Sequence, residues 1–285
     1  MHLFSQIFFR LSQFMRVMNE EGFNVAIQKT KKFSLLKLAP ARPYMNLFNC
    51  GVCDSRNDIN ILEHRYNHST GKLSAIYICK KCCSIICDCI LHSSASAQVE
   101  ASVEYYNNLI DKEDIENKIF ECKKLMLSLQ HYIKNINGKT FLDYGCGAGL
   151  MAIAAAELGF PHVYGVDWNI ETCKKTLEKY PSATNIEFYT DVKSISSKVD
   201  VVLLWHVLEH ISRPYSFLKE LGEHLKKGSK IFIQIPQYDS RHIVNTHYYF
   251  FNEPSIYYLF NRLDLNIIDI MYDSELAFMT IILEK

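Results

Sequence analysis

The sequence predicts an α/β protein with a doubly wound, mostly parallel sheet whose final strand runs antiparallel. Between residues 140 and 236, short apolar runs alternate with helix-forming runs, which is typical of a parallel sheet covered by helices on both faces. Two apolar runs, 265–270 and 276–283, then close the chain. The gap between them is too short for a crossover helix, so they predict an antiparallel hairpin.

Composition limits the function. Lysine and arginine together number 31, as do aspartate and glutamate, so the net charge of zero provides no overall field that would attract nucleic acid. Seven of the ten cysteines lie between Cys50 and Cys89, and no signal peptide precedes them. This clustering favours metal binding in a reduced compartment, the cytoplasm, over a disulfide framework.

Residues 1–45 predict an amphipathic helical segment. Apolar side chains recur at helical spacing from residue 3 to residue 18, but Arg10 and the polar residues interrupt them too often for a membrane span. We expect this segment to pack on the body of the protein or on a second subunit, as in a homodimer. Contact of residues 2–18 with a membrane surface is the less favoured alternative.

Residues 46–92 predict a small zinc-ribbon-like unit. Two C-x-x-C pairs, Cys50 with Cys53 and Cys79 with Cys82, are separated by 25 residues, which leaves room for a hairpin. Each pair can lie on a tight turn with both sulfurs aimed at one ion, so we expect a structural Zn²⁺ held by four thiolates, with no open position for catalysis. Six other side chains keep the ligand assignment open: Cys83, Cys87, Cys89, His64, His68 and His92.

Residues 99–285 predict the main domain. After a helical stretch, 99–134, a short strand ends in Asp143, and alternate glycines follow at positions 145, 147 and 149 before a helix that stops at Gly159. Glycines let the backbone approach a ligand closely, and the start of a helix presents free N–H groups. The segment 140–150 is therefore a predicted cofactor-binding loop.

Four further strands are expected after this loop: 163–166, 186–190, 199–205 and 230–235. The first two end in the acids Asp167 and Asp191. The run 199–205 is almost wholly apolar, as expected of a central strand buried on both faces. A helix that begins at Pro214 should end at Gly228, where a glycine is typical of a helix C-cap.

The loop distinguishes two classes of cofactor. A dinucleotide is the first candidate because the acid Asp167 follows the second strand, but the dinucleotide fingerprint needs a small residue where Leu150 stands. Asp143, just before the glycines, would also repel a pyrophosphate. A ligand that carries a cationic amine and a sulfonium suits this carboxylate instead.

The loop from Asp143 to Gly149, with Asp167 after the next strand, resembles the D-x-G-x-G-x-G motif and the second-strand acid of class I S-adenosylmethionine-dependent methyltransferases. The runs 205–210 and 225–233 are similar to that family too, so the resemblance covers about two thirds of the chain. It implies a Rossmann-like sheet, with the reversed final strand of that family, and S-adenosylmethionine as the cofactor.

A four-cysteine unit ahead of such a domain is similar to methyltransferases of deoxysugar, cell-surface polysaccharide and natural-product pathways. This resemblance implies a small-molecule acceptor, such as a sugar nucleotide. Asp54 and Cys83 depart from the pattern, because glycine is usual after each pair of a zinc knuckle.

The resemblance also implies roles in cofactor binding. The loop should contact the methionine portion and the ribose, Asp167 should accept both ribose hydroxyls, and Trp168 should lie along the adenine. Asp191 is expected to accept from the adenine amine, Tyr106 to cover the cofactor or lie in the core, and His206 to face the cofactor or acceptor. The loop residues concerned are Asp143, Tyr144, Gly145, Cys146, Gly147 and Gly149.

Methyl transfer is an in-line displacement, so alignment supplies much of the rate, and a base is required only if the acceptor must lose a proton. Three histidines near the carboxyl ends of predicted strands are candidates for this base: His206, and His242 and His247 from the histidine- and aromatic-rich loop 237–251. His210 is as readily explained by a structural role.

Other functions remain open at this stage. An RNA or protein methyltransferase could use the cysteine unit to grip its substrate, although zero net charge and the lack of interleaved basic and aromatic residues count against RNA. A dinucleotide-dependent oxidoreductase, or a binding protein without catalysis, is the alternative from another class. The methylated atom, oxygen, nitrogen or carbon, is not specified by any motif.

Overall fold

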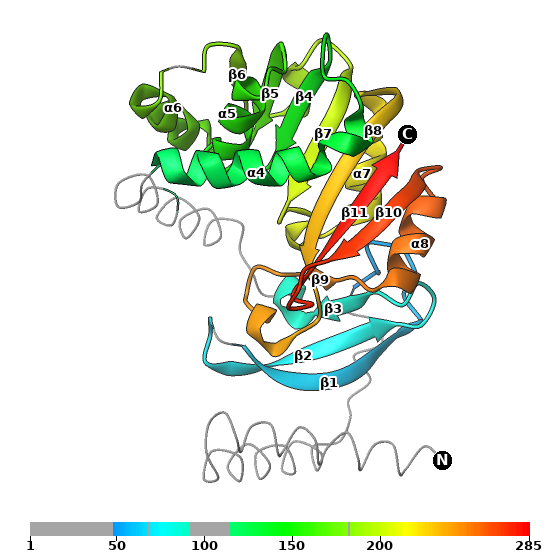
Figure 1. Ribbon diagram of the computed structural model, residues 1–285. Helices are drawn as coiled ribbons and strands as arrows, with labels where there is room; N and C mark the ends of the chain where they lie inside the picture. Colours follow the sequence, from blue (N-terminus) through cyan, green and yellow to red (C-terminus); the bar gives the residue numbers. More distant parts are fainter. Residues whose placement is uncertain (1–47, 68, 92–105, 107–114, 182) are drawn as a thin grey trace. The chain divides into compact units, whose positions relative to one another are not determined.

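The computed structural model describes residues 48–285 except 68, 92–105, 107–114 and 182 (Figure 1). By its internal contacts the chain divides into two units, residues 1–46 and residues 47–285, and only the second is described here. The predicted amphipathic segment 1–45 therefore lies outside the described residues. So does most of the predicted helical stretch before residue 115, apart from Tyr106, which is helical.

A seven-stranded sheet forms the centre of the second unit, in the order β10-β11-β8-β7-β4-β5-β6. The strands from β6 to β8 are parallel, whereas β11 runs antiparallel to both β8 and β10. The predicted fold class and the reversed final strand are thus confirmed. The strands are β4 (Thr140–Tyr144), β5 (His162–Val166), β6 (Ile186–Tyr189), β7 (Val199–Trp205), β8 (Leu225–Pro236), β10 (Asn266–Tyr272) and β11 (Phe278–Glu284).

Side chains alternate between the two faces of this sheet, as the strand period requires. In β7, Val201 and Leu203 enter one core with the helices α4 and α5, while Val202 and Leu204 enter the other core with α7 and α8. This central strand is buried on both faces, which explains a sequence that is apolar except for Asp200. The helices are α4 (Ile115–Ile133), α5 (Leu150–Glu157), α6 (Ile170–Lys179), α7 (Pro214–Glu223) and α8 (Glu253–Asn261).

The expected end of α7 at Gly228 is wrong. The helix ends at Glu223, and Leu225 already pairs with Val199 of β7. Gly228 has a positive φ, as a glycine at a helix cap would, but it lies inside β8, where its N–H donates to the carbonyl of Lys285. Strand pairing with β7 outweighs the local cap signal, so the helix stops one turn early.

A second, four-stranded antiparallel sheet has the order β1-β2-β3-β9. Its first three strands come from the cysteine-rich region, and the expected hairpin is the pair β1–β2. The fourth strand, β9, comes from the histidine- and aromatic-rich loop more than 160 residues later. The strands are β1 (Ile59–Asn67), β2 (Lys72–Cys79), β3 (Ile85–Cys87) and β9 (Tyr249–Phe250).

Residues 47–285 thus form one compact unit in which the cysteine-rich region and the seven-stranded sheet share a core. The predicted domain boundaries at 46–92 and 99–285 stay a prediction. In the part of the chain that the structure describes, no helix has the length and apolar character needed to cross a membrane.

Candidate active site and cysteine cluster

The glycine loop connects β4 to α5 at the carboxyl end of the parallel strands. Gly147 has a φ of 54°, and a Cβ built there would lie 2.4 Å from Cζ of Tyr106. At Gly145, with a φ of 75°, a Cβ would lie 2.5 Å from a methyl carbon of Val207. Both positions therefore require glycine for the backbone conformation and for the close approach of a neighbour. Tyr106, a predicted cofactor-binding residue, packs directly on this loop.

Asp167 is fixed against the loop by two backbone N–H groups. Gly147 donates to Oδ2 at 2.9 Å and Asn169 donates to Oδ1 at 3.0 Å. Burial raises the pKa of this carboxyl, and the two hydrogen bonds oppose the rise. Each oxygen keeps a second lone pair, so Asp167 has the acceptors that a pair of neighbouring hydroxyls would require.

Asp143 is almost completely buried, with 2% of its surface exposed, at the end of β4. Among the described residues its Oδ2 has no hydrogen-bond partner. Burial, with a further contribution from the charge of Asp167, raises the pKa of Asp143 to about 7. Two buried carboxyls beside one glycine loop form an electron-rich site, which suits a cationic ligand and disfavours a pyrophosphate.

The other predicted cofactor residues lie in different surroundings. The Trp168 side chain, directly after Asp167, is 48% exposed. Asp191 is exposed and caps a short 3₁₀ turn by accepting from the N–H of Lys193 at 2.9 Å. The Tyr144 ring instead packs edge-to-face on Phe217 of α7, with ring centroids 5.0 Å apart, so only its backbone belongs to the loop.

Cys146, also a predicted cofactor residue, points into the protein. Its Sγ lies 3.6 Å from Sγ of Cys173 on α6, and that second thiol donates to the carbonyl of Gly147. Its N–H donates to the carbonyl of Val166 at 3.2 Å and its carbonyl accepts from the N–H of Gly149 at 2.7 Å, so the backbone of Cys146 shapes the loop. The contact between the two thiols and the hydrogen bond from Cys173 fasten the loop to α6.

Two of the three candidate bases meet at one aromatic ring. His206 follows β7 with a φ of 56°, and its imidazole lies 4.9 Å from the ring of Phe278. His242, in the 3₁₀ turn Ser240–His242, lies 5.1 Å from the same ring. The Nδ1–H of His242 donates to the carbonyl of Gln237 at 3.1 Å, which leaves its Nε2 as an acceptor.

The third candidate base, His247, belongs to a separate cluster. Its ring lies 4.8 Å from that of His210, and its Nδ1–H donates to the carbonyl of His242 at 2.8 Å. Burial, with a further contribution from His210, lowers the pKa of His247 to about 4. This histidine is therefore neutral at physiological pH.

Glu209 and His210 follow His206 at the carboxyl end of β7, and neither was predicted to be a catalytic, cofactor or metal ligand residue. Both lie in the 3₁₀ turn Leu208–His210 after β7, and Glu209 is fully buried. Glu209 Oε1 lies 3.4 Å from Nδ1 of His206 and 4.0 Å from Nε2 of His210. The signal in the sequence was the spacing His-x-x-Glu-His, which places three polar side chains on one tight turn.

The four cysteines of the two C-x-x-C pairs come together. The Sγ atoms of Cys50 and Cys82 are 3.6 Å apart, those of Cys53 and Cys79 are 3.5 Å apart, and all four lie within 4.8 Å of one another. A tetrahedral zinc–thiolate site with bonds of about 2.3 Å has sulfur–sulfur edges of about 3.8 Å, so the cluster has the size that Zn²⁺ requires. Hydrogen bonds from the three neighbouring thiols lower the pKa of Cys50.

The two cysteine turns have the same backbone geometry. Asp54 and Cys83, the residues after each pair, have φ values of 59° and 61°, and their N–H groups donate to the carbonyls of Cys50 and Cys79 at 2.7 Å. The positions therefore adopt the left-handed conformation for which glycine is usual, despite the side chains present. The departure in the sequence does not change the shape of the turn.

The additional cysteines of this region lie outside the four-sulfur group. Cys87 and Cys89 belong to a small separate core with Phe250, and Cys89 donates to the carbonyl of His247 at 2.9 Å. The structure does not bring Cys83 or His64 into the group of potential ligands either. His68 and His92 lie outside the described residues.

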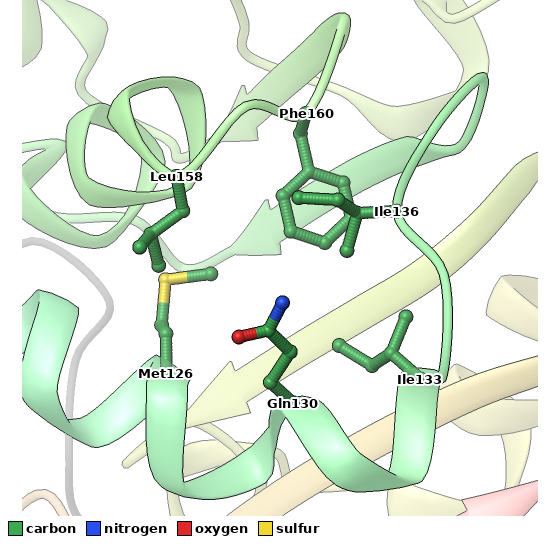
Figure 2. Close-up of a pocket in the computed structure, with 6 residues that line it drawn as sticks. All are labelled: Met126, Gln130, Ile133, Ile136, Leu158 and Phe160. Atoms are coloured by element: carbon green, nitrogen blue, oxygen red, sulfur yellow. The ribbon is translucent and has the colours of Figure 1, made fainter.

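A small hollow of about 10 Å³, about the room that one water molecule needs, lies elsewhere, between α4 and the end of α5 (Figure 2). Its lining is apolar except for one amide, and it contains none of the residues discussed above. It is a packing gap between two helices, without the charges that a cationic ligand or a methyl acceptor would need. The lining residues are Met126, Gln130, Ile133, Ile136, Leu158 and Phe160.

Comparison with known proteins agrees with this geometry. Residues 119–270, more than half of the chain, match the family model of a methyltransferase domain. The chain is similar to a ubiquinone biosynthesis O-methyltransferase from Idiomarina loihiensis, at 33% identity over 110 residues that cover 36% of this chain and 45% of that protein. It is also similar to a ribosomal protein L11 methyltransferase from Dechloromonas aromatica, at 34% identity over 96 residues, 32% and 30% of the two chains.

The matched stretch spans less than half the length of either relative. Among solved structures, a SAM-dependent methyltransferase from Aquifex aeolicus is similar over 63% of this chain and 96% of that chain, with a TM-score of 0.50 and 18% identity. This similarity is one of fold.

Proposed function

We propose that this chain, which belongs to the methyltransferase domain family and is an S-adenosylmethionine-dependent methyltransferase, transfers the methyl group to a small molecule. The observation that carries this proposal is the burial of the cysteine cluster. Its four thiols are at most 4% exposed, and they share a core with α7 and α8. Between the first two cysteines Gly51 and Val52 are buried as well, so this turn offers little surface with which to grip RNA or a protein.

The contacts of the cysteine turns support a structural role for them. Arg262, the residue after α8, donates to the carbonyl of Val52 and stacks on Tyr215 of α7, while the buried hydroxyl of Tyr249 accepts from the N–H of Gly51 at 2.8 Å. These contacts join the first turn to α7, to the end of α8 and to β9. We therefore include in the proposal a structural Zn²⁺ held by Cys50, Cys53, Cys79 and Cys82.

The relatives differ in their acceptors. One is named for O-methylation in ubiquinone biosynthesis and the other for methylation of a ribosomal protein. Similarity to the first relative favours methylation of an oxygen atom in a small molecule. The four-cysteine unit suggests a sugar nucleotide as a further candidate acceptor. A protein acceptor remains the alternative, and it is tested by the same assay. Placement in the cytoplasm stays a prediction.

Bound S-adenosylmethionine supplies an electrophilic methyl group on a sulfonium. Asp143 provides the nearby negative charge for its cationic groups, and Asp167 accepts from the ribose hydroxyls. Trp168, which follows Asp167, and Tyr106, which packs on Gly147, provide aromatic rings that can cover the cofactor. Asp191 accepts from the adenine amine. Together these side chains hold the methyl donor in one orientation, which is how alignment lowers the barrier.

An acceptor hydroxyl must lose its proton, and the histidines differ in their suitability for this step. His247, with a pKa of about 4, is a weak base. We therefore assign the base to His206 or His242, which both contact Phe278. Nε2 of His242 is available to take the proton, because its Nδ1 already donates to a backbone carbonyl.

Calorimetric titration of the purified protein with S-adenosylmethionine tests the cofactor site. We expect Asp167→Ala to weaken binding by at least about tenfold, because the lost carboxylate makes charge-assisted hydrogen bonds. Asp191→Asn, at an exposed cap, should weaken it less. Equal affinity of the Asp167 variant and the unchanged protein would refute the assigned role.

Incubation with sugar nucleotides, phenols and a peptide pool, read by a methyl mass shift, then tests the acceptor class; methylation of peptides alone would overturn the small-molecule proposal.

A further inference from the structure

A second group of potential metal ligands lies apart from the cysteines. Glu209 and His210 follow β7, and His247 comes from the loop between β8 and β9. One ligand atom from each lies within 4.8 Å of the other two. We propose that Glu209, His210 and His247 form a divalent cation site that takes an ion of the Zn²⁺ class and leaves a further coordination position open.

Glu209 is the observation that most requires an explanation. The residue is fully buried, and among the described residues neither carboxylate oxygen has a hydrogen-bond partner. An isolated buried carboxylate costs several kcal/mol or more, so buried charges are paired or coordinate metals. The two nearest imidazole nitrogens, of His206 and His210, stand off at 3.4 and 4.0 Å. A cation between Glu209 and the histidines would compensate the negative charge of the Glu209 carboxylate, which these long contacts do not neutralise.

The Nε2 atoms of His210 and His247 each have a lone pair with which to bind a metal ion. The Nδ1 of His210 lies 2.8 Å from the carbonyl of Thr246, and the Nδ1 of His247 lies 2.8 Å from the carbonyl of His242. A carbonyl only accepts, so each Nδ1 carries the proton and each Nε2 keeps its lone pair. A backbone carbonyl on the second nitrogen is the usual way in which a metal-binding histidine is oriented.

The dimensions suit a zinc-like ion. Bonds of about 2.1 Å in a tetrahedral site require edges of about 3.4 Å between ligand atoms. The separation of 4.0 Å between Glu209 Oε1 and His210 Nε2 would have to close by about 0.6 Å, which small side-chain rotations provide. Two imidazoles and one carboxylate are the ligand set of sites with an open position for water or a substrate oxygen. The cysteine cluster, with four thiolates, has no such position.

The cluster is also held together by the backbone. The N–H of Tyr248 donates to the carbonyl of Glu209 at 2.8 Å, so the segment that carries His247 is fastened to the turn that carries the other two ligands. His206, a candidate base, borders the same carboxylate. The site thus lies at the carboxyl end of β7, next to the region where we expect the acceptor.

The test uses the full-length protein and Co²⁺ as the probe. After dialysis against a chelator and reloading of the thiolate site with one equivalent of Zn²⁺, Co²⁺ is titrated in and followed by absorption. A site of two imidazoles and a carboxylate should give weak ligand-field bands in the visible range without the sulfur-to-cobalt charge-transfer band of a thiolate site. Saturation at about one added equivalent supports the proposal, and no saturable ligand-field band overturns it.

Variants separate metal binding from a structural role. Glu209→Gln and His247→Asn should weaken Co²⁺ and Zn²⁺ binding by about ten- to a hundredfold, whereas His131→Asn, an exposed histidine on α4, should leave it unchanged. In chelator, Glu209→Gln should melt at the same temperature as the unchanged protein or higher, because an uncompensated buried charge has been removed. Unchanged metal affinity in both variants refutes the site.

These results do not depend on the acceptor or on methyl transfer. Binding of S-adenosylmethionine, measured separately, tests the cofactor loop rather than this cluster. If a variant fails to fold, the titration of the unchanged protein still decides whether a second, sulfur-free site exists.

Discussion

At the scale of single residues, the pair Asp143 and Asp167 defines the chemistry of the proposed cofactor loop. Both carboxyls are buried beside the glycines, but only Asp167 has its oxygens satisfied by backbone N–H groups. Among the described residues Oδ2 of Asp143 has no hydrogen-bond partner, so an ionised Asp143 destabilises the ligand-free protein. A bound cationic cofactor would compensate the charge of Asp143. We therefore expect substitution of Asp143 to change stability, and substitution of Asp167 to change cofactor affinity.

Asp143 should make stability depend on pH in a specific direction. Its pKa rises from 3.8 to about 7 on folding, so between these values the folded protein binds the extra proton and the free energy of unfolding falls as pH increases. A change of this size corresponds to about 4 kcal/mol. Asp143→Asn should therefore raise the free energy of unfolding of the ligand-free protein by about 2–4 kcal/mol at pH 8 and have little effect near pH 4.

Urea unfolding at a series of pH values measures this difference. With saturating S-adenosylmethionine the advantage of Asp143→Asn should disappear or reverse, because the cation then compensates the carboxylate. A variant that is less stable at pH 8 without ligand would contradict the explanation.

At the scale of elements, the two-residue strand β9 connects the cysteine turns to the site. Its Tyr249 is fully buried, and the hydroxyl accepts from the N–H of Gly51 and donates to the carbonyl of Ser212. Gly51 lies inside the first cysteine pair, and Ser212 precedes α7. One side chain thus joins three elements that are distant in the sequence.

Removing that hydroxyl should destabilise the protein. In Tyr249→Phe the buried N–H of Gly51 loses its acceptor, which should cost about 1–3 kcal/mol in the free energy of unfolding, measured by denaturant titration. Tyr257→Phe is the matched control, since that side chain of α8 is 48% exposed and should change stability by less than about 0.5 kcal/mol. Equal effects of the two changes would argue against the role of Tyr249.

At the scale of the whole described unit, the cysteine cluster is part of the main core. Its four cysteines belong to the same hydrophobic cluster as buried residues of β7, α7 and α8. Loss of the proposed zinc would leave four thiols in van der Waals contact inside this core, and the effect should spread beyond the two turns.

Cys79→Ser should therefore lower the stability of residues 47–285 as a unit. We expect a loss of at least about 3 kcal/mol, seen by calorimetry as one transition at lower temperature, because metal loss and a disturbed core act together. Cys122→Ser on α4, outside the cluster, should have a small effect and keep the metal content. A separate early transition with the main transition unchanged would show that the cysteine region unfolds independently.

Parts of the fold could be predicted because their signals are local. The alternation of apolar runs and helices, the almost wholly apolar run of β7 and the short final connection each follow from side-chain periodicity or chain length. Where a long-range contact competes with a local signal, the prediction fails. Gly228 resembles a helix cap, yet the segment around it pairs with β7 and β11, and the helix ends at Glu223.

The sequence by itself determined the class of sheet, the glycine loop with its two acids, and the pairs of cysteines, since each depends on neighbours in the chain. Only the tertiary structure decided which groups meet across long separations. The two residues of β9 carry too little pattern to reveal their partner strand, and nothing local indicates that His247 approaches Glu209. Contacts between segments are selected by the packing of the whole core, which spacing along the chain does not encode.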